Sequence, residues 1–303
     1  MKGVFFLVGP TATGKSELAA DVALRVGAEI VSADAFQIYR GLNLLTAKPD
    51  AVTLSKVSHH LLGTVSPSEE MNVEMFRRQA GEAIAKIHAG GRRALVVGGS
   101  GLYIKALTHG LSALPPADAE LRRQLNELST AELGARLSEL DPTTAATIDR
   151  QNRRRLIRAL EICHLTGQPA ATQRMTWQAE EAGQAIAAAG VFVFRDRDDL
   201  YERIDRRVEQ MFEQGVMDEV RDIGPTSATA EKTLGLAELR ALAAGQISRA
   251  EWTAAIQQAT RRYAKRQLTW FRRQTNFEAL NLSRLSHVKA VEWITERALS
   301  LFR

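Results

Sequence analysis

The sequence predicts an α/β fold, in which a parallel β-sheet is flanked by helices and interrupted by an all-helical insertion. Three observations support this fold class. Short apolar runs that are typical of buried strands alternate with amphipathic stretches, the first run leads directly into a glycine-rich turn, and the middle of the chain shows helical patterns without a strand signal. Alternating strands and helices favour a parallel sheet, whose ligands bind at the carboxyl ends of its strands.

Four apolar runs are the predicted strands, at residues 4–8, 29–32, 94–97 and 191–194. A helix is expected directly after the first run, because apolar residues recur at helical spacing at Leu18, Val22 and Val26. A second helix, between the second and third runs, has Asn72 as its N-cap and ends at Gly90-Gly91. Its apolar face is formed by Phe76, Ala80, Ile84 and Ile87.

The domain prediction is a core with one insertion. Residues 111–185, which begin near Pro115-Pro116, contain short helical patterns rich in Ala, Leu, Glu and Arg. Residues 1–110 and 186–303 then form the α/β core, and the chain after Arg195 is expected to be helical to its end, including late basic helices. No internal repeat is present.

Composition narrows the class of protein. The 303 residues are 45% hydrophobic and 25% charged, which is ordinary for a globular protein. One cysteine, Cys163, excludes a disulfide framework, a cysteine-rich zinc site and an iron–sulfur site, and it fits a reducing cytoplasm. Since no apolar run is long enough to span a bilayer, we expect no membrane partner. A monomer is the default expectation, because no interface stripe is evident.

The glycine-rich turn after the first predicted strand has the pattern G-x-x-x-x-G-K-S, the phosphate-binding P-loop. Its residues are Gly9, Pro10, Thr11, Ala12, Thr13, Gly14, Lys15 and Ser16. Backbone N–H groups of such a loop point at phosphate oxygens, the lysine reaches the terminal phosphates, and the Ser16 hydroxyl can ligate Mg²⁺. The sequence therefore predicts a P-loop NTPase-like core that binds a di- or triphosphate together with Mg²⁺.

Two further polar positions follow predicted strands. Asp34 comes after the second strand and could ligate Mg²⁺, act as a general base or cap the next helix, and the residues alone leave these three roles open. Gly98-Gly99-Ser100-Gly101 is a second glycine-rich turn, which serves either ligand approach or tight packing. Ser100 is accordingly a ligand contact or a cap. His59-His60 lacks a third ligand at a spacing suited to a metal.

Basic residues gather in three places. Arg122 and Arg123 lie early in the insertion, and Arg153, Arg154, Arg155 and Arg158 begin a helix with the apolar face Leu156, Leu160 and Cys163. The late helix carries Arg261, Arg262, Lys265, Arg266, Arg272 and Arg273 with interleaved aromatics. Together these clusters favour an RNA-binding surface over a merely solvated face. Arg203 and Arg207 flank the stripe Leu200, Ile204, Val208 and Met211. Either could reach a phosphate or simply extend along the surface to solvent.

These segments resemble the tRNA dimethylallyltransferases, also called tRNA isopentenyltransferases. The resemblance covers nearly the whole chain in family order, and its most specific blocks are Asp34-Ala35-Phe36-Gln37-Ile38-Tyr39 and Thr46-Ala47-Lys48-Pro49. The other matching blocks are residues 9–16, 59–61, 98–103, 155–161 and 260–267.

The resemblance implies transfer of a dimethylallyl group from dimethylallyl diphosphate to the N6 amine of the adenosine 3′ to the anticodon. It implies Asp34 as general base, Arg207 and Ser100 as catalytic residues, and Thr11, Lys15 and Ser16 as holders of diphosphate and Mg²⁺. The flipped base would contact Asp34, Ala35, Phe36, Gln37 and Ser100. The anticodon stem–loop would be held by Arg122, Arg154, Arg155, Arg158, Lys232, Arg262, Lys265 and Arg266.

Three alternatives remain beside this interpretation: a P-loop small-molecule kinase, an adenine-nucleotide prenyltransferase and an RNA-binding relative without catalysis. The lack of a second Mg²⁺ carboxylate disfavours the kinase, and the basic insertion disfavours a free nucleotide as acceptor. Departures from the family pattern at Ala35, at Leu44-Leu45 and at Leu236-Ala237 bear on the choice of tRNA and support the non-catalytic alternative.

Overall fold

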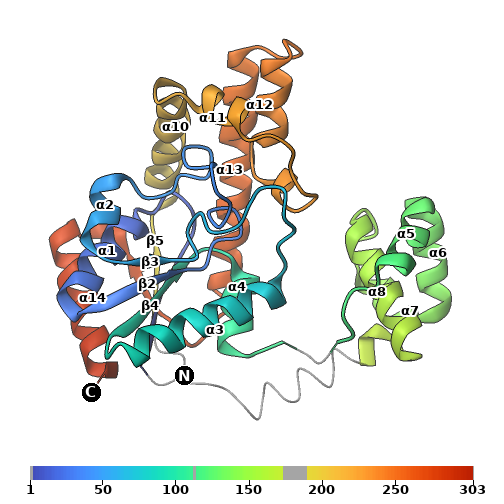
Figure 1. Ribbon diagram of the computed structural model, residues 1–303, viewed down its shortest axis with the longest axis horizontal. Coiled ribbons are helices and arrows are strands. Elements are labelled where there is room, and N and C mark those ends of the chain that lie inside the picture. The colour runs from blue at the N-terminus through green and yellow to red at the C-terminus, as the bar shows by residue number, and fades with distance from the viewer. Residues whose placement is uncertain (1–2, 112–113, 173–189, 303) are drawn as a thin grey trace. The chain divides into compact units, whose positions relative to one another are not determined.

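The computed structural model describes residues 3–111, 114–172 and 190–302. Contacts divide the chain into two compact units, one formed by Met1–Thr108 with Ala187–Arg303 and the other by His109–Ile186. The predicted boundary at residues 185–186 lies outside the described residues. The two units, each described by itself below, are drawn in Figure 1.

The first unit is built on a parallel sheet of six strands with the order β3-β2-β4-β1-β5-β6. The predicted α/β class is confirmed. The strands are β1 (Val4–Val8), β2 (Ala28–Ser32), β3 (His59–His60), β4 (Arg93–Gly98), β5 (Gly190–Phe194) and β6 (Glu278–Asn281).

Four of these strands, β1, β2, β4 and β5, are the predicted ones. The expectation that the chain is helical from Arg195 to its end is wrong at β6, and β3 was not predicted. Both are edge strands: β3 has two residues, and only Leu280 of β6 is buried. An edge strand that buries so few side chains has no apolar run in its sequence, so the pattern does not predict it.

Helices cover both faces of the sheet (Figure 1). One apolar core lies between the sheet and helices α1 (Lys15–Val26) and α14 (His287–Phe302), and the predicted face Leu18, Val22 and Val26 is buried in it. On the other face, α3 (Val73–Ala89) and α4 (Gly101–Thr108) contribute to a second core. The side chain of Asn72 caps α3 by accepting from Met75 N, as predicted, and α2 (Ala51–Lys56) packs on α1.

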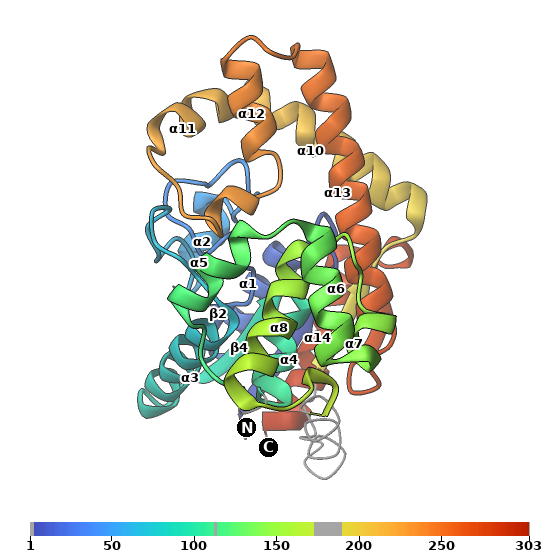
Figure 2. The same cartoon turned by 90° about the vertical axis from the view of Figure 1, so that its right-hand side faces the viewer.

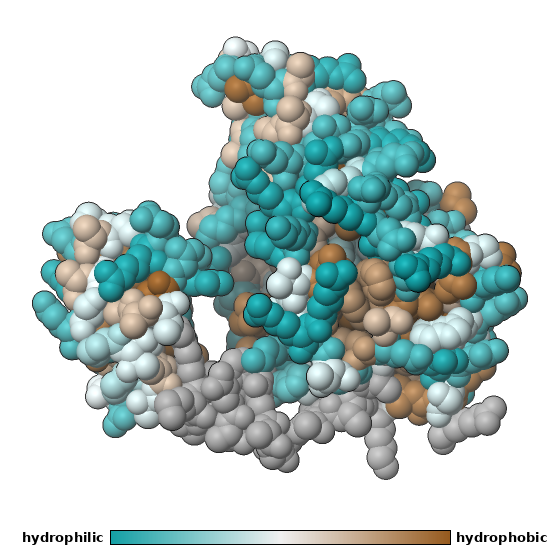
Figure 3. Space-filling model, turned by 180° about the vertical axis from the view of Figure 1, so that it is seen from behind, coloured by the Kyte–Doolittle hydropathy of each residue, from teal (hydrophilic) through white to brown (hydrophobic). Residues whose placement is uncertain are grey.

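The remaining helices of this unit follow β5. They are α10 (Arg197–Glu213), α11 (Val216–Asp222), η1 (Ala230–Lys232), α12 (Leu236–Ala243) and α13 (Arg249–Phe271), with the short turn η2 (Leu282–Arg284) after β6. The long helix α13 starts at a capping box of Ser248 and Glu251 and packs along α10. Figure 3 shows that hydrophilic residues predominate on the upper part of this unit, where α12 and α13 lie.

The described part of the second unit is helical, as predicted for the insertion. It contains α5 (Ala119–Glu127), α6 (Thr130–Leu140), α7 (Pro142–Thr147) and α8 (Arg153–Thr166), which are labelled in Figure 2. Its core includes Leu125, Leu133, Leu137, Leu156 and Leu160. The Asn152 side chain caps α8, and Gly167 ends it in a left-handed conformation with φ 64°.

Candidate active site

The P-loop joins β1 to α1 at the carboxyl end of the sheet. Two of its residues have positive φ, Ala12 at 67° and Gly14 at 87°, so the loop wraps tightly before α1 begins. Gly9 is required for packing, because a Cβ there would lie 2.2 Å from Val193 O. The Lys15 amine donates a hydrogen bond to Pro10 O at 3.1 Å, which folds the side chain back over the loop.

Three arginines donate hydrogen bonds to the P-loop. Arg207 donates to Thr11 Oγ1 at 3.0 Å, Arg203 Nε donates to Ala12 O at 2.9 Å, and Arg195 Nε donates to Thr13 O at 2.9 Å. Arg207 Nε is buried and has no hydrogen-bond partner within the described chain. A buried donor without a partner beside a P-loop is suited to an anionic ligand.

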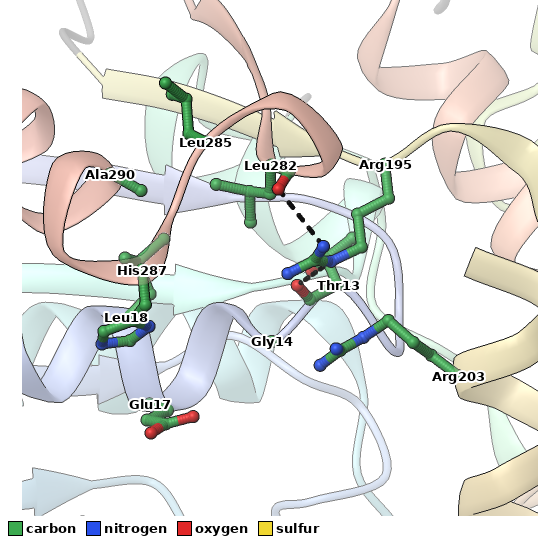
Figure 4. Close-up of a pocket in the computed structure, with 10 residues that line it drawn as sticks. All are labelled: Thr13, Gly14, Glu17, Leu18, Arg195, Arg203, Leu282, Leu285, His287 and Ala290. Carbon is green, nitrogen blue, oxygen red and sulfur yellow. Dashed lines mark hydrogen bonds between the residues drawn. The ribbon is translucent and has the colours of Figure 1, made fainter. Parts of the chain in front are cut away.

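A cavity of about 220 Å³ lies beside the P-loop (Figure 4). Arg195 and Arg203 reach toward it next to Thr13 and Gly14, and Arg195 also donates to Leu282 O at 3.3 Å. Asp34 does not line this cavity. It lines a smaller one of about 30 Å³ with Lys15, Ser16, Ser32 and Gln37. The smaller cavity brings two of the predicted phosphate-binding residues, Lys15 and Ser16, to a carboxylate, which makes it the candidate site of the chemistry.

One oxygen of Asp34 is engaged in the backbone turn that follows β2. Asp34 Oδ1 accepts from Phe36 N at 3.0 Å and from Gln37 N at 3.3 Å. The helix-capping role that the sequence left open is wrong, because residues 35–38 form a turn and the next helix, α2, is capped by Asp50. The second oxygen remains for a substrate proton or a metal ion.

The charges of the site are incompletely compensated. Burial lowers the pKa of Lys15 to about 8, a shift that the nearby Asp34 opposes and Arg207 supports. Burial also lowers the pKa of Arg207 to about 10, again against the effect of Asp34. A single carboxylate therefore faces two desolvated cations, and an added anion would stabilise both of them.

The lowered pKa of Lys15 predicts a pH-dependent affinity for diphosphate. Below pH 8 the amine already carries its proton, so this contribution is constant. Above pH 8 the ligand-free protein must take up a proton on binding, and the association constant should fall about tenfold per pH unit. Calorimetric titration with inorganic diphosphate from pH 7 to pH 9.5 checks this. Lys15→Met, which retains only the ionisation of diphosphate itself, is the control, and equal pH slopes for the two proteins would contradict the prediction.

The second glycine-rich turn packs against α13 and the segment after β2. A Cβ at Gly98 would lie 2.2 Å from Ala33 O, and one at Gly101 would lie 2.6 Å from Trp270 Cδ2, so tight packing explains these glycines. The Ser100 hydroxyl oxygen accepts from Ala35 N at 2.9 Å. This contact fixes the turn directly beside Asp34.

Of the predicted base-contacting residues, Asp34 and Gln37 line the smaller cavity. Gln37 Nε2 donates to Thr46 O at 3.1 Å and to Ala47 O at 2.9 Å, so its side-chain oxygen is the atom left to accept from a ligand. The Phe36 ring lies 6.1 Å from the ring of Tyr263. Burial, followed by the charge of Asp34, raises the pKa of the Tyr263 phenol.

The predicted tRNA-contacting cations occupy different environments. Arg154 and Arg155 on α8, Lys232 on η1, and Arg262, Lys265 and Arg266 on α13 are exposed. Arg122 and Arg158 instead hold Glu161, which is fully buried: Arg122 Nε donates to its Oε1 at 2.9 Å and Arg158 to its Oε2 at 2.5 Å. These two arginines therefore also stabilise the second unit.

The histidine pair lies in β3. His60 Nε2 is 2.6 Å from Glu29 Oε2, and His59 lines the smaller cavity. Burial lowers the pKa of His59. Among the described residues, no group of three or more His, Cys, Asp and Glu side chains is arranged to hold a metal ion.

Sequence reasoning assigned no role to Gln267, Arg195 or Tyr263, all of which contact the site. Gln267 lay in a family-like block without a function of its own. Arg195 directly follows a predicted strand, at the end of the sheet where ligands bind, and this position could have identified it as a site residue. Tyr263 was counted only among the aromatics of a basic helix.

A family model described as IPP transferase matches residues 37–274, and one described as isopentenyl transferase matches residues 2–67. The chain belongs to the IPP transferase family. It is 43% identical to tRNA dimethylallyltransferase 1 of Citrifermentans bemidjiense over 277 residues, which cover 90% of each chain. It is 44% identical to tRNA dimethylallyltransferase of Akkermansia muciniphila over 89% of this chain and 90% of the relative.

Solved structures agree with the family. A tRNA isopentenylpyrophosphate transferase from Bacillus halodurans has a TM-score of 0.72 and 34% identity, over 100% of this chain and 97% of that chain. A eukaryotic dimethylallyltransferase that acts on tRNA has a TM-score of 0.74 over 93% of this chain and 74% of that chain, and at 24% identity it supports the fold alone. Among the described residues of this IPP transferase, no helix is both long and apolar enough to cross a membrane.

Proposed function

We propose that this protein transfers a dimethylallyl group from dimethylallyl diphosphate to the N6 amine of the adenosine 3′-adjacent to the anticodon of tRNA. The products are N6-isopentenyladenosine and diphosphate. The observation that supports this most directly is that the P-loop residue Lys15 and the buried Arg207 both lie close to a single carboxylate, Asp34. The relatives described above carry the corresponding activity in their names.

The P-loop would hold the group that leaves. When the bond between the allylic carbon and the bridging oxygen breaks, both bonding electrons go to diphosphate. Lys15, the free P-loop N–H groups and Arg207 would stabilise that growing negative charge, and such preorganised donors are usually the largest contribution to catalysis. The Arg207 Nε hydrogen, buried and without a partner in the described chain, is available for this anion.

Asp34 would receive the proton. The N6 amine attacks the allylic carbon, a new nitrogen–carbon bond forms, and one proton leaves the nitrogen. The Asp34 oxygen that does not hold the Phe36 and Gln37 N–H groups is the acceptor for this proton. Gln37 Oε1 and Ser100 would orient the extruded base, which must leave its stack to reach the cavity.

The residues of the smaller cavity fit Mg²⁺. The Ser16 and Ser32 hydroxyls and the Asp34 carboxylate are oxygen donors that line it together, and Mg²⁺ prefers oxygen ligands. Ser16 would hold the ion, which when bound supplies positive charge to the diphosphate, and the second Asp34 oxygen stays free to act as the base.

The exposed basic residues would hold the anticodon stem–loop. Arg154 and Arg155 begin α8, and Arg262, Lys265 and Arg266 lie along α13. We therefore expect Arg154→Ala to weaken tRNA binding and to lower the slope of log K against log salt by about 1, because one phosphate contact is lost. Filter binding of tRNA between 50 and 300 mM salt measures both quantities.

Arg158 on the same helix is the matched comparison. Removing it leaves the buried Glu161 with one ion-pair partner fewer, so Arg158→Ala should lower the thermal stability of the protein. Arg154→Ala should leave the melting temperature unchanged. An Arg154→Ala protein with wild-type affinity and salt slope would remove this residue from the interface.

The proposal also includes a cytoplasmic location and a monomeric state. The lone Cys163 is a free, buried thiol, in keeping with a reducing cytoplasm. A monomer is expected, and light scattering with and without tRNA tests it.

Release of diphosphate tests the proposed reaction against its alternatives. The proposal predicts diphosphate release from dimethylallyl diphosphate only when unmodified tRNA is present. Release with AMP in place of tRNA would favour an adenine-nucleotide prenyltransferase. Turnover of ATP with a small acceptor would favour a kinase, and binding of tRNA without release would favour a non-catalytic relative.

A further inference from the structure

A buried glutamine on α13 connects the two glycine-rich turns of the site. Gln267 is 6% exposed, its Oε1 accepts from Thr11 N at 2.9 Å, and its Nε2 donates to Gly99 O at 2.9 Å. The two ends of the carboxamide thus have different partners. An acceptor is needed at the P-loop and a donor at the second turn, and a carboxamide supplies both.

The two partners belong to the two halves of the reaction. Thr11 is the P-loop residue whose hydroxyl oxygen also accepts a hydrogen bond from Arg207, on the side of the leaving diphosphate. Gly99 precedes Ser100, whose hydroxyl accepts from Ala35 N next to the proposed base Asp34. The chain of contacts therefore runs from the diphosphate site through Gln267 to the acceptor side.

Little room exists for another arrangement. A Cβ at Gly99 would lie 2.4 Å from Gln267 Nε2 and 2.9 Å from Gly9 O. One helical turn earlier, the Tyr263 phenol lies beside the side chains of Ser100 and Gln267. Gln267 is consequently held at both ends of its carboxamide, and a change of its side chain must alter the spacing of the two turns or leave polar groups without partners.

We propose that Gln267 is a positioning residue for the transfer, which sets the separation between the leaving diphosphate and the base Asp34. The inference rests on the proposed function. It does not require Gln267 to touch either substrate. Displacement reactions need the reacting atoms about 3–3.5 Å apart and in line, and small misplacements cost large factors in rate.

Two substitutions separate positioning from simple structural support. Gln267→Met loses both hydrogen bonds at every pH. Gln267→Glu keeps an acceptor for Thr11 N, but its carboxylate cannot donate to Gly99 O; the protonated acid can. We expect kcat at pH 8 to fall roughly 10- to 100-fold in both variants. As the pH is lowered, the ratio of Gln267→Glu to wild-type kcat should rise, whereas the ratio for Gln267→Met should stay constant.

The exposed Gln258 on the same helix supplies the control, because Gln258→Glu makes the same chemical change away from the site. The inference predicts wild-type kcat for Gln258→Glu and a tRNA Kd within about twofold of wild type for both Gln267 variants, since no RNA contact is removed. Wild-type kcat in either Gln267 variant, or a flat ratio for Gln267→Glu, would overturn the inference while leaving the proposed function intact.

An inactive wild-type protein would instead be a failure of the proposed function. Calorimetry with inorganic diphosphate then decides about Gln267. Loss of the Thr11 anchor should weaken diphosphate binding by Gln267→Met about fivefold or more, as expected for a lost buried hydrogen bond. An unchanged Kd would overturn the inference.

Discussion

Asp34→Asn should abolish nearly all turnover while leaving the local structure in place. The asparagine oxygen can still accept from Phe36 N and Gln37 N, which hold the turn after β2. The amide cannot take a proton from the N6 amine, so we expect kcat to fall by about 10²–10⁴-fold, the range of general-base catalysis. Single-turnover transfer to tRNA measures this directly.

The affinity for tRNA separates the base from a merely structural residue. Asp34→Asn should bind tRNA as tightly as the wild type, because the exposed cations that would contact phosphate are untouched. Asp222→Asn, at an exposed position at the end of α11, is the matched control and should retain full activity. Near-normal turnover in Asp34→Asn would remove the role of general base.

Arg207→Met should have the second-largest effect. It removes the guanidinium that contacts Thr11 and the buried Nε donor that has no partner in the described chain. Loss of one preorganised donor to a developing anion costs about 10²–10³-fold in kcat. The KM for dimethylallyl diphosphate should rise as well, because the ground-state diphosphate is also anionic. Steady-state kinetics at saturating tRNA give both constants.

The neighbouring Arg206 is a close control. It is exposed and pairs with Glu202 on the surface of α10, so Arg206→Met removes the same charge one residue away without touching the P-loop. We expect its kinetics to match the wild type, since such exposed ion pairs contribute little. Equal losses in both variants would mean that net charge, rather than the Arg207 contact, is responsible.

The central part of the fold was predictable because its signals are local. Strand β1, the P-loop and α1 form one continuous pattern of apolar run, glycine-rich turn and helical spacing. Strands β3 and β6 lie at the sheet edges and bury too little to produce a run, so the sequence could not reveal them.

The places of side chains in the site were predictable where they depend on neighbours in sequence. Lys15 and Asp34 follow strands and were placed at the ligand-binding edge from that position, whereas the role of Asp34 as a base came from the family resemblance. The partnership of Arg122 with Glu161, and that of Gln267 with Thr11 and Gly99, join residues far apart in the chain. Tertiary packing alone creates such pairs, and a basic helix gives no sign of which of its cations face inward.

Mass spectrometry of tRNA nucleosides tests the proposed reaction most directly. Unmodified tRNA with an adenosine 3′ to the anticodon is incubated with the protein, Mg²⁺ and dimethylallyl diphosphate, then digested. The proposal predicts that this adenosine gains one five-carbon unit with wild-type protein and stays unmodified with Asp34→Asn. A product on AMP but none on tRNA, or no product although tRNA is bound, would contradict it.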